Sequence, residues 1–508
     1  MKFERSSGIL LHPTSLPGLY GIGDLGPEAH RWVDWLAGSG CKLWQVLPLS
    51  PTGYGDSPYQ CFSAFAGNPY LISPELLLKD NLLHPNDLVE KTNFPTGRVD
   101  YGAVIPWKLN LLERAFIRFS PDPGPVREEF DRFRAENASW LEDYALFMAI
   151  KESRGGGSWE DWPAPLRKRE LSALTEARNA LSSHVLRFTF YQFLFFRQWY
   201  ALKDYANQRG IQIIGDIPIF VAYDSADVWA HPDLFFFDED GKPTVVAGVP
   251  PDYFSPTGQL WGNPLYRWEV HKHTGYKWWL ERLRATLQIV DIVRLDHFRG
   301  FAGYWEVPYG NPTAEIGRWV PGPGKDFFRA VKEALGELPI IAEDLGVITP
   351  DVVEMRETFG LPGMKILQFA FSGPDNPFLP HHYPPNCAVY TGTHDNDTAR
   401  GWCESASREE RDFACRYLAR EGNLKSLTSS AKSKTLQASF AWDLIRAAWA
   451  SVAVFALAPM QDLLNLGREA RMNYPSRLGG NWEWRMTKDA LSKTLQKRIR
   501  ELNLLHSR

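Results

Sequence analysis

Eight short apolar runs recur along the chain, and each ends in polar residues. They lie at 8–16, 41–49, 211–221, 289–298, 339–345, 363–371, 387–397 and 452–460. Their apolar positions do not alternate with polar ones, which is typical of strands buried on both faces, as in a parallel sheet. Helix-like stretches separate several of them, at 26–40, 326–337 and 349–360. Eight buried strands alternating with helices favour a closed (β/α)8 barrel over an open doubly wound sheet.

The spacing of the runs predicts two insertions in this α/β barrel. Some 161 residues, from Ser50 to Gly210, separate the second and third runs and carry helical patterns. We expect a mostly helical subdomain at about 50–185, after strand two, and a helix at 184–210 that serves the barrel. A segment dense in Gly, Pro and aromatic residues predicts a loop-rich, lid-bearing subdomain after strand three, at about 222–288. The whole chain, 1–508, is then one catalytic barrel.

Composition narrows the class of protein. With 44% apolar and 23% charged residues the chain is an ordinary globular protein, and its net charge of −4 argues against a polyanionic partner. No basic run offers a nucleic-acid footprint. The aromatic content of 14% is high. Most of these rings pack in a core, but the many tryptophans also suit flat faces on which sugar rings stack.

Cysteines and terminal patterns bear on the compartment. The five cysteines are odd in number and form no CxxC pair, which argues against a disulfide framework or a zinc site and favours reduced thiols. The amino-terminal residues lack a signal-peptide pattern. The longest mostly apolar run, Ala447–Met460, has 14 residues, short of the ~20 that span a bilayer. We therefore expect a cytoplasmic protein that does not enter a membrane, as a monomer or weak homo-oligomer.

Acidic side chains follow four of the predicted strands. Asp216 ends the third run, Asp296 the fourth, Glu343 the fifth and Asp395 the seventh. In a (β/α)8 barrel the carboxyl ends of the strands form the active-site rim. A single Asp at a strand end is an ordinary turn or cap residue. Several together are costly because like charges raise each other's pKa, so the cluster indicates metal binding or acid–base chemistry.

A neighbouring cation separates these two alternatives. Carboxylates could bind magnesium or calcium through their oxygens. Arg294 lies two residues before Asp296, and residues i and i+2 face the same side of a strand. A guanidinium there keeps Asp296 ionised and repels a metal ion. The pattern favours an anionic nucleophile and no metal.

The spacing of two of these acids suits cleavage of a glycosidic bond with retention of configuration. That chemistry needs two carboxyl groups ~5–5.5 Å apart, one ionised and one protonated. Neighbouring strands lie ~4.8 Å apart, so Asp296 and Glu343, at the ends of consecutive strands, could meet this spacing. Glu343 follows three apolar residues in a site rich in carboxylates, which raises its pKa and suits the general acid.

Longer motifs resemble a known family. The strand-four RxD, strand-five E and strand-seven HD, preceded by the strand-three Asp, match the short blocks of the α-amylase superfamily. Five strings resemble one branch closely: SPYQCFSAFAGNPYLI (57–72), GVPPDYFSPTGQLWGNPLY (248–266), VRLDHFRGF (293–301), AEDLG (342–346) and GTHDNDT (392–398). They are similar to the amylomaltases, the 4-α-glucanotransferases or disproportionating enzymes of glycoside hydrolase family 77. The resemblance runs from about Gly8 to Trp484.

The resemblance implies a role for each candidate residue. Asp296 would be the nucleophile, Glu343 the acid/base, and Asp395 would hold sugar hydroxyls in the transition state. The family uses no metal and no organic cofactor, and its substrates are α-1,4-glucans and maltooligosaccharides. The segment at 466–475 corresponds to a second lid. The substrate-binding residues would be Tyr59, Asp216, Asp252, Gln259, Trp261, Arg294, His297 and His394.

Structural roles compete for some of these residues. Trp261 could simply anchor its loop by packing, and His297 points away from the nucleophile if its strand is regular, as a core histidine would. Trp482 and Trp484 are interpreted as packing residues. The same carboxylates would also serve a plain α-glucan hydrolase, because the covalent intermediate partitions between water and a sugar. A catalytically silent glucan-binding protein would lack the carboxylates that this chain has.

Overall fold

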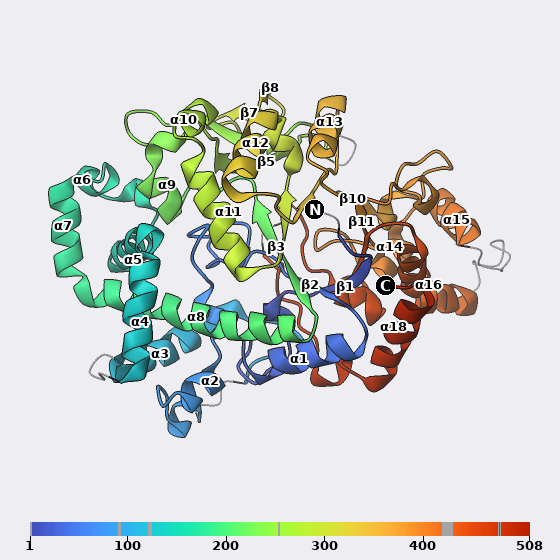
Figure 1. Ribbon diagram of the computed structural model, residues 1–508, viewed down its shortest axis with the longest axis horizontal. Helices are drawn as coiled ribbons and strands as arrows, with labels where there is room; N and C mark the ends of the chain where they lie inside the picture. Colours follow the sequence, from blue (N-terminus) through green and yellow to red (C-terminus); the bar gives the residue numbers. More distant parts are fainter. Residues whose placement is uncertain are drawn as a thin grey trace.

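Eight parallel strands form the central sheet of the computed structural model, which describes residues 3–89, 93–119, 124–251, 255–418, 430–475, 477 and 479–508 (Figure 1). The strand order is β10-β11-β12-β1-β2-β3-β6-β9. A backbone hydrogen bond from Ala342 N to Pro362 O, 2.9 Å, joins the two ends of this order and closes the barrel. The strands are β1 (Ser6–Leu10), β2 (Leu43–Gln45), β3 (Gln212–Pro218), β6 (Ile292–Asp296), β9 (Ile340–Ala342), β10 (Gly363–Ile366), β11 (Cys387–Tyr390) and β12 (Phe455–Pro459). Each predicted run supplies one of them, so the fold prediction is confirmed.

Helices surround most of this barrel. The alternation lapses once: residues 367–386, all of which are described, form only the short 3₁₀ turns η8 (Leu367–Phe369) and η9 (Pro380–His382) between β10 and β11. Elsewhere the helices are α1 (Pro27–Gly38), α8 (Ser182–Gln208), α11 (Lys277–Ile289), α12 (Gly324–Leu335), α13 (Pro350–Thr358), α14 (Ala399–Ser405), α15 (Arg408–Tyr417), α16 (Ser430–Ala450), α17 (Met460–Leu463) and α18 (Lys493–Leu505).

The insertion after β2 is helical, and the long helix α8 ties it to the barrel. In α8, the ring of Trp199 lies 6.1 Å from that of Trp44 in β2, whereas Phe190 stacks at 4.4 Å on Phe119 of α3. Barrel and insertion therefore share one apolar core. The inserted helices, on the left of Figure 1, are α2 (Pro74–Lys79), α3 (Tyr101–Phe119), α4 (Pro125–Glu136), α5 (Ala138–Ser153), α6 (Ala164–Arg167) and α7 (Leu171–Ala180).

The insertion after β3 is more ordered than the loop-rich subdomain expected there. It holds α9 (Ala226–Ala230), α10 (Trp268–His273) and the hairpin of β4 (Val245–Val249) and β5 (Gln259–Pro264). This hairpin pairs with β7 (Gly303–Pro308) and β8 (Arg318–Pro321), which follow β6, in an antiparallel sheet of order β5-β4-β7-β8. Helix α11, included in the predicted insertion, packs on β3 and β6 as a barrel helix.

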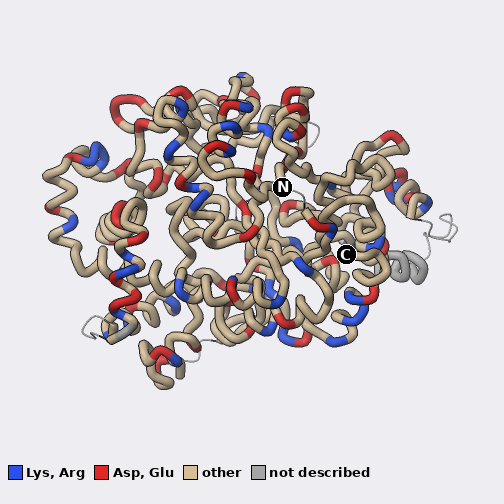
Figure 2. Tube along the Cα trace, in the orientation of Figure 1, with Lys and Arg blue, Asp and Glu red and all other residues tan. Residues whose placement is uncertain are grey.

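Both signs of charge occur throughout the part of the chain that the structure describes (Figure 2). Figure 2 shows Lys and Arg interspersed with Asp and Glu along the trace, with both signs on the barrel helices and on the inserted ones. Among the residues that the structure describes, no helix combines the length and apolarity needed to cross a bilayer.

Candidate active site

A buried arginine pairs two aspartates at the carboxyl ends of β3 and β6. Strand register sets Asp216 opposite Arg294. One guanidinium nitrogen, Nη1 of Arg294, lies 2.6 Å from Asp216 Oδ2 and 2.8 Å from Asp296 Oδ1. Burial lowers the pKa of Arg294, but the two carboxylates outweigh it and raise that pKa well above its ordinary value. Asp296 thus has a permanent positive charge beside it, as the sequence predicted.

Strand register also places the two central acids side by side. Leu295 pairs with Ala342, and Asp296 and Glu343 are the next residues on β6 and after β9. Glu343 is buried. Its Oε2 accepts a hydrogen bond from His297 N at 2.6 Å, and its Oε1 accepts one from Leu345 N at 3.1 Å. Burial and then the charge of Asp296 raise the pKa of Glu343 well above its ordinary value, which favours the protonated acid.

The next acid along the chain faces away from this pair. Asp344 accepts a hydrogen bond from Met364 N at 2.7 Å and forms an ion pair with Arg356. Successive side chains point to opposite sides where a strand ends. At the end of β9, Glu343 therefore faces the site and Asp344 faces away from it.

His297 departs from the regular strand that the sequence suggested. Its backbone is left-handed, with φ 52°, and this turn aims its N–H at Glu343. Its ring lies edge-on against Trp261 of β5, with centroids 4.8 Å apart, and Trp261 Nε1 donates to Gln259 Oε1 at 3.3 Å. Burial lowers the pKa of His297 to about 4, so the ring is neutral. Gln259 and Trp261, the two predicted lid residues on β5, are therefore linked to the site by the contact of Trp261 with His297.

The opposite side of the site is carried by the loop after β11. His394 Nε2 lies 3.3 Å from Asp395 Oδ2. Burial lowers the pKa of His394, but Asp395 outweighs it and raises that pKa. Burial conversely raises the pKa of Asp395, but His394 and a hydrogen bond from Asn473 bring it down to about 2. The two residues therefore form an ion pair whose carboxylate stays ionised.

Tyr59 bridges the two sides. Its hydroxyl donates to Asp216 Oδ2 at 2.8 Å, and its ring stacks on His394 with centroids 5.0 Å apart and planes at 19°. One face of the ring is therefore already used. That Tyr59 also stacks on a sugar remains a prediction.

Three residues at this site were missed or undervalued by sequence reasoning. Asn473 Nδ2 donates to Asp395 Oδ1 at 2.6 Å, and Arg471 Nη2 donates to the Asp395 carbonyl at 2.6 Å. Trp482, interpreted as a packing residue, is buried, but it packs against Tyr59 and His394, with centroids 5.8 Å from each. The resemblance of 466–475 to a lid was the one signal that pointed near Asn473.

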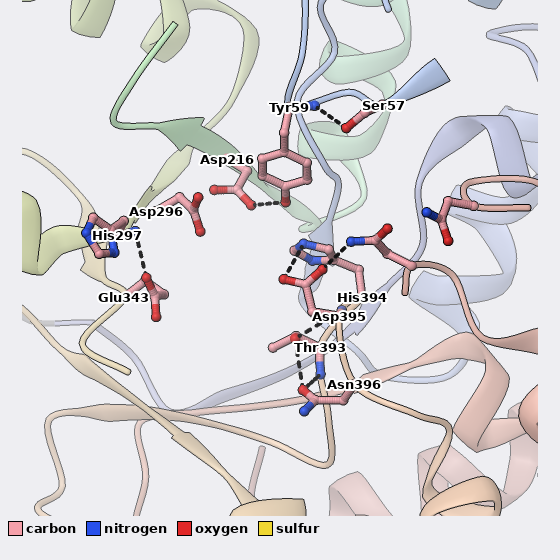
Figure 3. Close-up of polar contacts among 12 residues, drawn as sticks. Ser57, Tyr59, Asp216, Asp296, His297, Glu343, Thr393, His394, Asp395 and Asn396 are labelled. Atoms are coloured by element: carbon pink, nitrogen blue, oxygen red, sulfur yellow. Dashed lines mark hydrogen bonds and ion pairs between the residues drawn. The ribbon is translucent and has the colours of Figure 1, made fainter. Parts of the chain in front are cut away.

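Contacts link ten of the eleven predicted site residues in two sets, which meet at the peptide bond between Asp296 and His297, and Figure 3 shows part of each set. Asp252 lies outside the described residues. Within the part of the chain that the structure describes, no three His, Cys, Asp or Glu side chains are grouped so that they could hold a metal ion. The connected residues are Tyr59, Asp216, Gln259, Trp261, Arg294, Asp296, His297, Glu343, His394 and Asp395.

A (β/α)8 barrel that pairs a buried acid with an arginine-bound aspartate at the carboxyl ends of adjacent strands has the fold and the two acids of glycoside-cleaving enzymes. Comparison with known proteins specifies the kind. The chain belongs to the 4-alpha-glucanotransferase family, whose model matches residues 11–492. It is therefore an enzyme of this family.

Individual relatives match over nearly the whole chain. It is 54% identical to a 4-alpha-glucanotransferase of Thermus thermophilus over 506 residues, covering 99% of both chains. It is 47% identical to a chloroplastic/amyloplastic 4-alpha-glucanotransferase of Solanum tuberosum, covering 95% of this chain and 82% of the relative. An amylomaltase structure from Streptococcus agalactiae, in complex with acarbose, matches with a TM-score of 0.93 at 40% identity, covering 99% of this chain and all of the other.

Proposed function

We propose that this enzyme transfers α-1,4-glucan segments from a donor maltooligosaccharide to the 4-hydroxyl of an acceptor glucan or glucose. The reaction is a retaining double displacement through a covalent glycosyl-Asp296. The observation that carries this proposal is the β6–β9 register, which sets an arginine-paired aspartate beside a buried glutamic acid with a raised pKa. One carboxyl is suited to attack and the other to give up a proton.

The first displacement forms the intermediate. Glu343 donates its proton to the glycosidic oxygen as the bond to the anomeric carbon breaks, and Asp296 Oδ forms a bond to that carbon. The shortened glucan leaves with the proton. In the second displacement, Glu343, now a carboxylate, takes the proton of the acceptor 4-hydroxyl. The acceptor oxygen attacks the anomeric carbon and Asp296 leaves, which restores the starting state of both acids.

The surrounding residues hold the reacting groups. Arg294 orients Asp296, and Asp216 holds Arg294 through its 2.6 Å contact. Asp395 binds sugar hydroxyls as the ring distorts in the transition state, and its low pKa keeps it an acceptor. His394 and Tyr59 line the subsite before the scissile bond, and the neutral ring of His297 donates or accepts a single hydrogen bond there.

Transfer rather than hydrolysis requires that a sugar hydroxyl outcompete water. Positioning an acceptor can be worth the equivalent of ~10⁵ M or more. We assign this task to the hairpin of β4 and β5, from which Trp261 reaches His297. Gln259 and Trp261 would hold the acceptor, together with Asp252, which lies outside the described residues. A plain α-glucan hydrolase with the same carboxylates is the alternative.

We further propose a cytoplasmic enzyme that acts as a monomer or weak homo-oligomer. All five cysteines are buried, as suits reduced thiols in a core. The acarbose complex of the Streptococcus agalactiae amylomaltase supports an oligosaccharide as the substrate of this chain too. Size-exclusion chromatography with light scattering would test the oligomeric state, and a stable large assembly would contradict it.

Chromatography of the products from maltotriose tests the main proposal. We expect glucose together with a ladder of longer maltodextrins. Glucose and maltose without a ladder would establish the hydrolase instead.

Asp296→Asn, which keeps the size of the side chain, should lower turnover by about 10⁴-fold or more because it removes the nucleophile. That variant should still bind maltooligosaccharides in calorimetry, and undiminished turnover would refute the assignment of Asp296.

A further inference from the structure

The loop that carries His394 and Asp395 is held at both of its ends by one buried side chain. The loop runs from the end of β11 to the start of α14. Asp462 Oδ2 accepts a hydrogen bond from Thr391 Oγ1 at 2.6 Å, where the loop begins. Its other oxygen, Oδ1, accepts one from Ala399 N at 2.7 Å, where the loop ends. One carboxyl group therefore ties residue 391 to residue 399, and we call this pair of hydrogen bonds the clamp.

Asp462 is itself rigidly placed. It lies in the short helix α17, which begins directly after β12, and β12 pairs with β11 in the barrel. Thr391 N donates to Leu457 O of β12 at 3.2 Å, so the loop leaves the sheet while still attached to it. Asp462 is 1% exposed and Thr391 is fully buried. The clamp is thus part of the barrel wall rather than of the surface.

The chemistry of the clamp suits a carboxyl group. Two donors, one hydroxyl and one backbone N–H, converge on it, and a carboxylate offers an acceptor oxygen to each. The N–H of Ala399 belongs to the first residue of α14, where a negative charge also stabilises the helix N-terminus. A buried acid that served packing alone would be costly without such partners.

We propose that Asp462 is a positioning residue for the transfer reaction, acting through Thr391 and Ala399 to fix where Asp395 presents its carboxylate. This inference rests on the proposed role of Asp395 in the transition state. Asp395 lies four residues from each end of the clamp. Loss of either hydrogen bond releases one end of the loop from Asp462 and lets that end shift. Displacements of about 1 Å in an active site can cost about 10²-fold in rate.

Paired substitutions at Thr391 test the clamp. Thr391→Val keeps the shape of the side chain and removes the hydroxyl, whereas Thr391→Ser restores it. Turnover of maltotriose, divided by the folded fraction, should fall about 10-fold in the valine variant with KM for the donor changed less than about threefold. The serine variant should stay within about twofold of the wild type.

Substitutions of Asp462 extend the test. Asp462→Ala removes both hydrogen bonds and should lower kcat about 10²-fold. Asp462→Asn can accept from Ala399 with its oxygen and donate to Thr391 with its nitrogen, so it should recover most of that loss.

The matched control for Thr391→Val is Thr189→Val: Thr189 is also buried, and its hydroxyl donates to Val185 O at 2.9 Å inside α8, away from the site. Thr189→Val should lose about as much stability as Thr391→Val and keep the kcat of the wild type.

Asp395→Asn is measured alongside, so that a wrong role for Asp395 can be told apart from a wrong role for Asp462. If that variant keeps full turnover, the proposed role of Asp395 is wrong, and the positioning role falls with it. If Asp395→Asn is inactive while Thr391→Val and Asp462→Ala stay within twofold of wild-type kcat, the positioning role alone is wrong. Equal losses of kcat in Thr391→Val and Thr189→Val would also overturn it, because they would reduce the effect to stability.

Discussion

The two sides of the active site are built in different ways. On one side, Asp216, Arg294, Asp296 and Glu343 stand on or directly after barrel strands, and pairing between β3, β6 and β9 fixes their spacing. On the other side, His394 and Asp395 stand on a loop. They are placed by the backbone of β12, by Asp462 of α17 and by Asn473.

This difference decides how each side tolerates change. Strand register is shared by many backbone hydrogen bonds, so one substitution leaves the positions of Asp296 and Glu343 nearly intact and acts through charge. The loop is held by separate hydrogen bonds from several elements instead of a shared ladder, so the loss of one bond can shift Asp395. We therefore expect substitutions on the strand side to change the electrostatics of the site, and substitutions on the loop side to change its geometry.

Arg294→Met should have the largest effect. It keeps the length of the side chain and removes the charge, leaving Asp216, whose side chain is fully buried, and Asp296 without their partner. Breaking a buried pair costs about 3–5 kcal/mol of the free energy of unfolding. Loss of the charge beside the nucleophile should lower kcat/KM about 10³-fold. Urea unfolding and turnover of maltotriose measure the two effects.

The ion pair of Arg356 with Asp344 provides the matched control. It lies at the end of the adjacent strand and faces away from the site. Arg356→Met should also destabilise the fold, yet leave kcat/KM within about threefold. Comparable losses of kcat/KM in both variants would mean that Arg294 acts through stability and not through Asp296.

The sequence predicted the strand side well because its signal is local. A buried run that stops at an acid locates Asp216, Asp296 and Glu343 on a common rim, and the i, i+2 relation pairs Arg294 with Asp296. The loop side was predicted only in its own residues, His394 and Asp395. Asp462, which holds the two ends of their loop, and Asn473, which donates to Asp395, lie 67 and 78 residues beyond Asp395 in the chain. No periodic pattern links such positions.

The antiparallel sheet that contains β4 and β5 was hidden for a similar reason. Its strands β4 and β5 precede β6, whereas β7 and β8 follow it, so the sheet is assembled across a barrel strand. Glycine and proline within these strands weaken the alternation that marks a half-buried strand. The composition therefore suggested loops where the structure pairs distant segments.

Asn473→Ala should have the next largest effect and concerns the loop side. It removes the 2.6 Å hydrogen bond to Asp395 Oδ1. Hydrogen bonds to charged groups are worth about 1.5–3 kcal/mol, so kcat/KM should fall about 10-fold or somewhat more. Asn207→Ala is the control, because Asn207 makes the same kind of bond to Asp291 at 2.9 Å, far from the site. Equal activity of the Asn473 and Asn207 variants would show that the loop holds Asp395 without Asn473.

The smallest expected effect is a shift of one pKa on the strand side. After burial, the charge of Asp296 is the main cause that raises the pKa of Glu343, and Asp344 contributes less in the same direction. Asp296→Asn should therefore lower the pKa of Glu343, and Asp344→Asn should lower it by a smaller amount. Titration of ¹³C-labelled glutamate by NMR, with Glu343→Gln to assign the signal, measures both shifts. A larger shift with Asp296→Asn than with Asp344→Asn is expected if strand register sets Asp296 beside Glu343. If burial alone raises the pKa of Glu343, neither substitution will change that pKa.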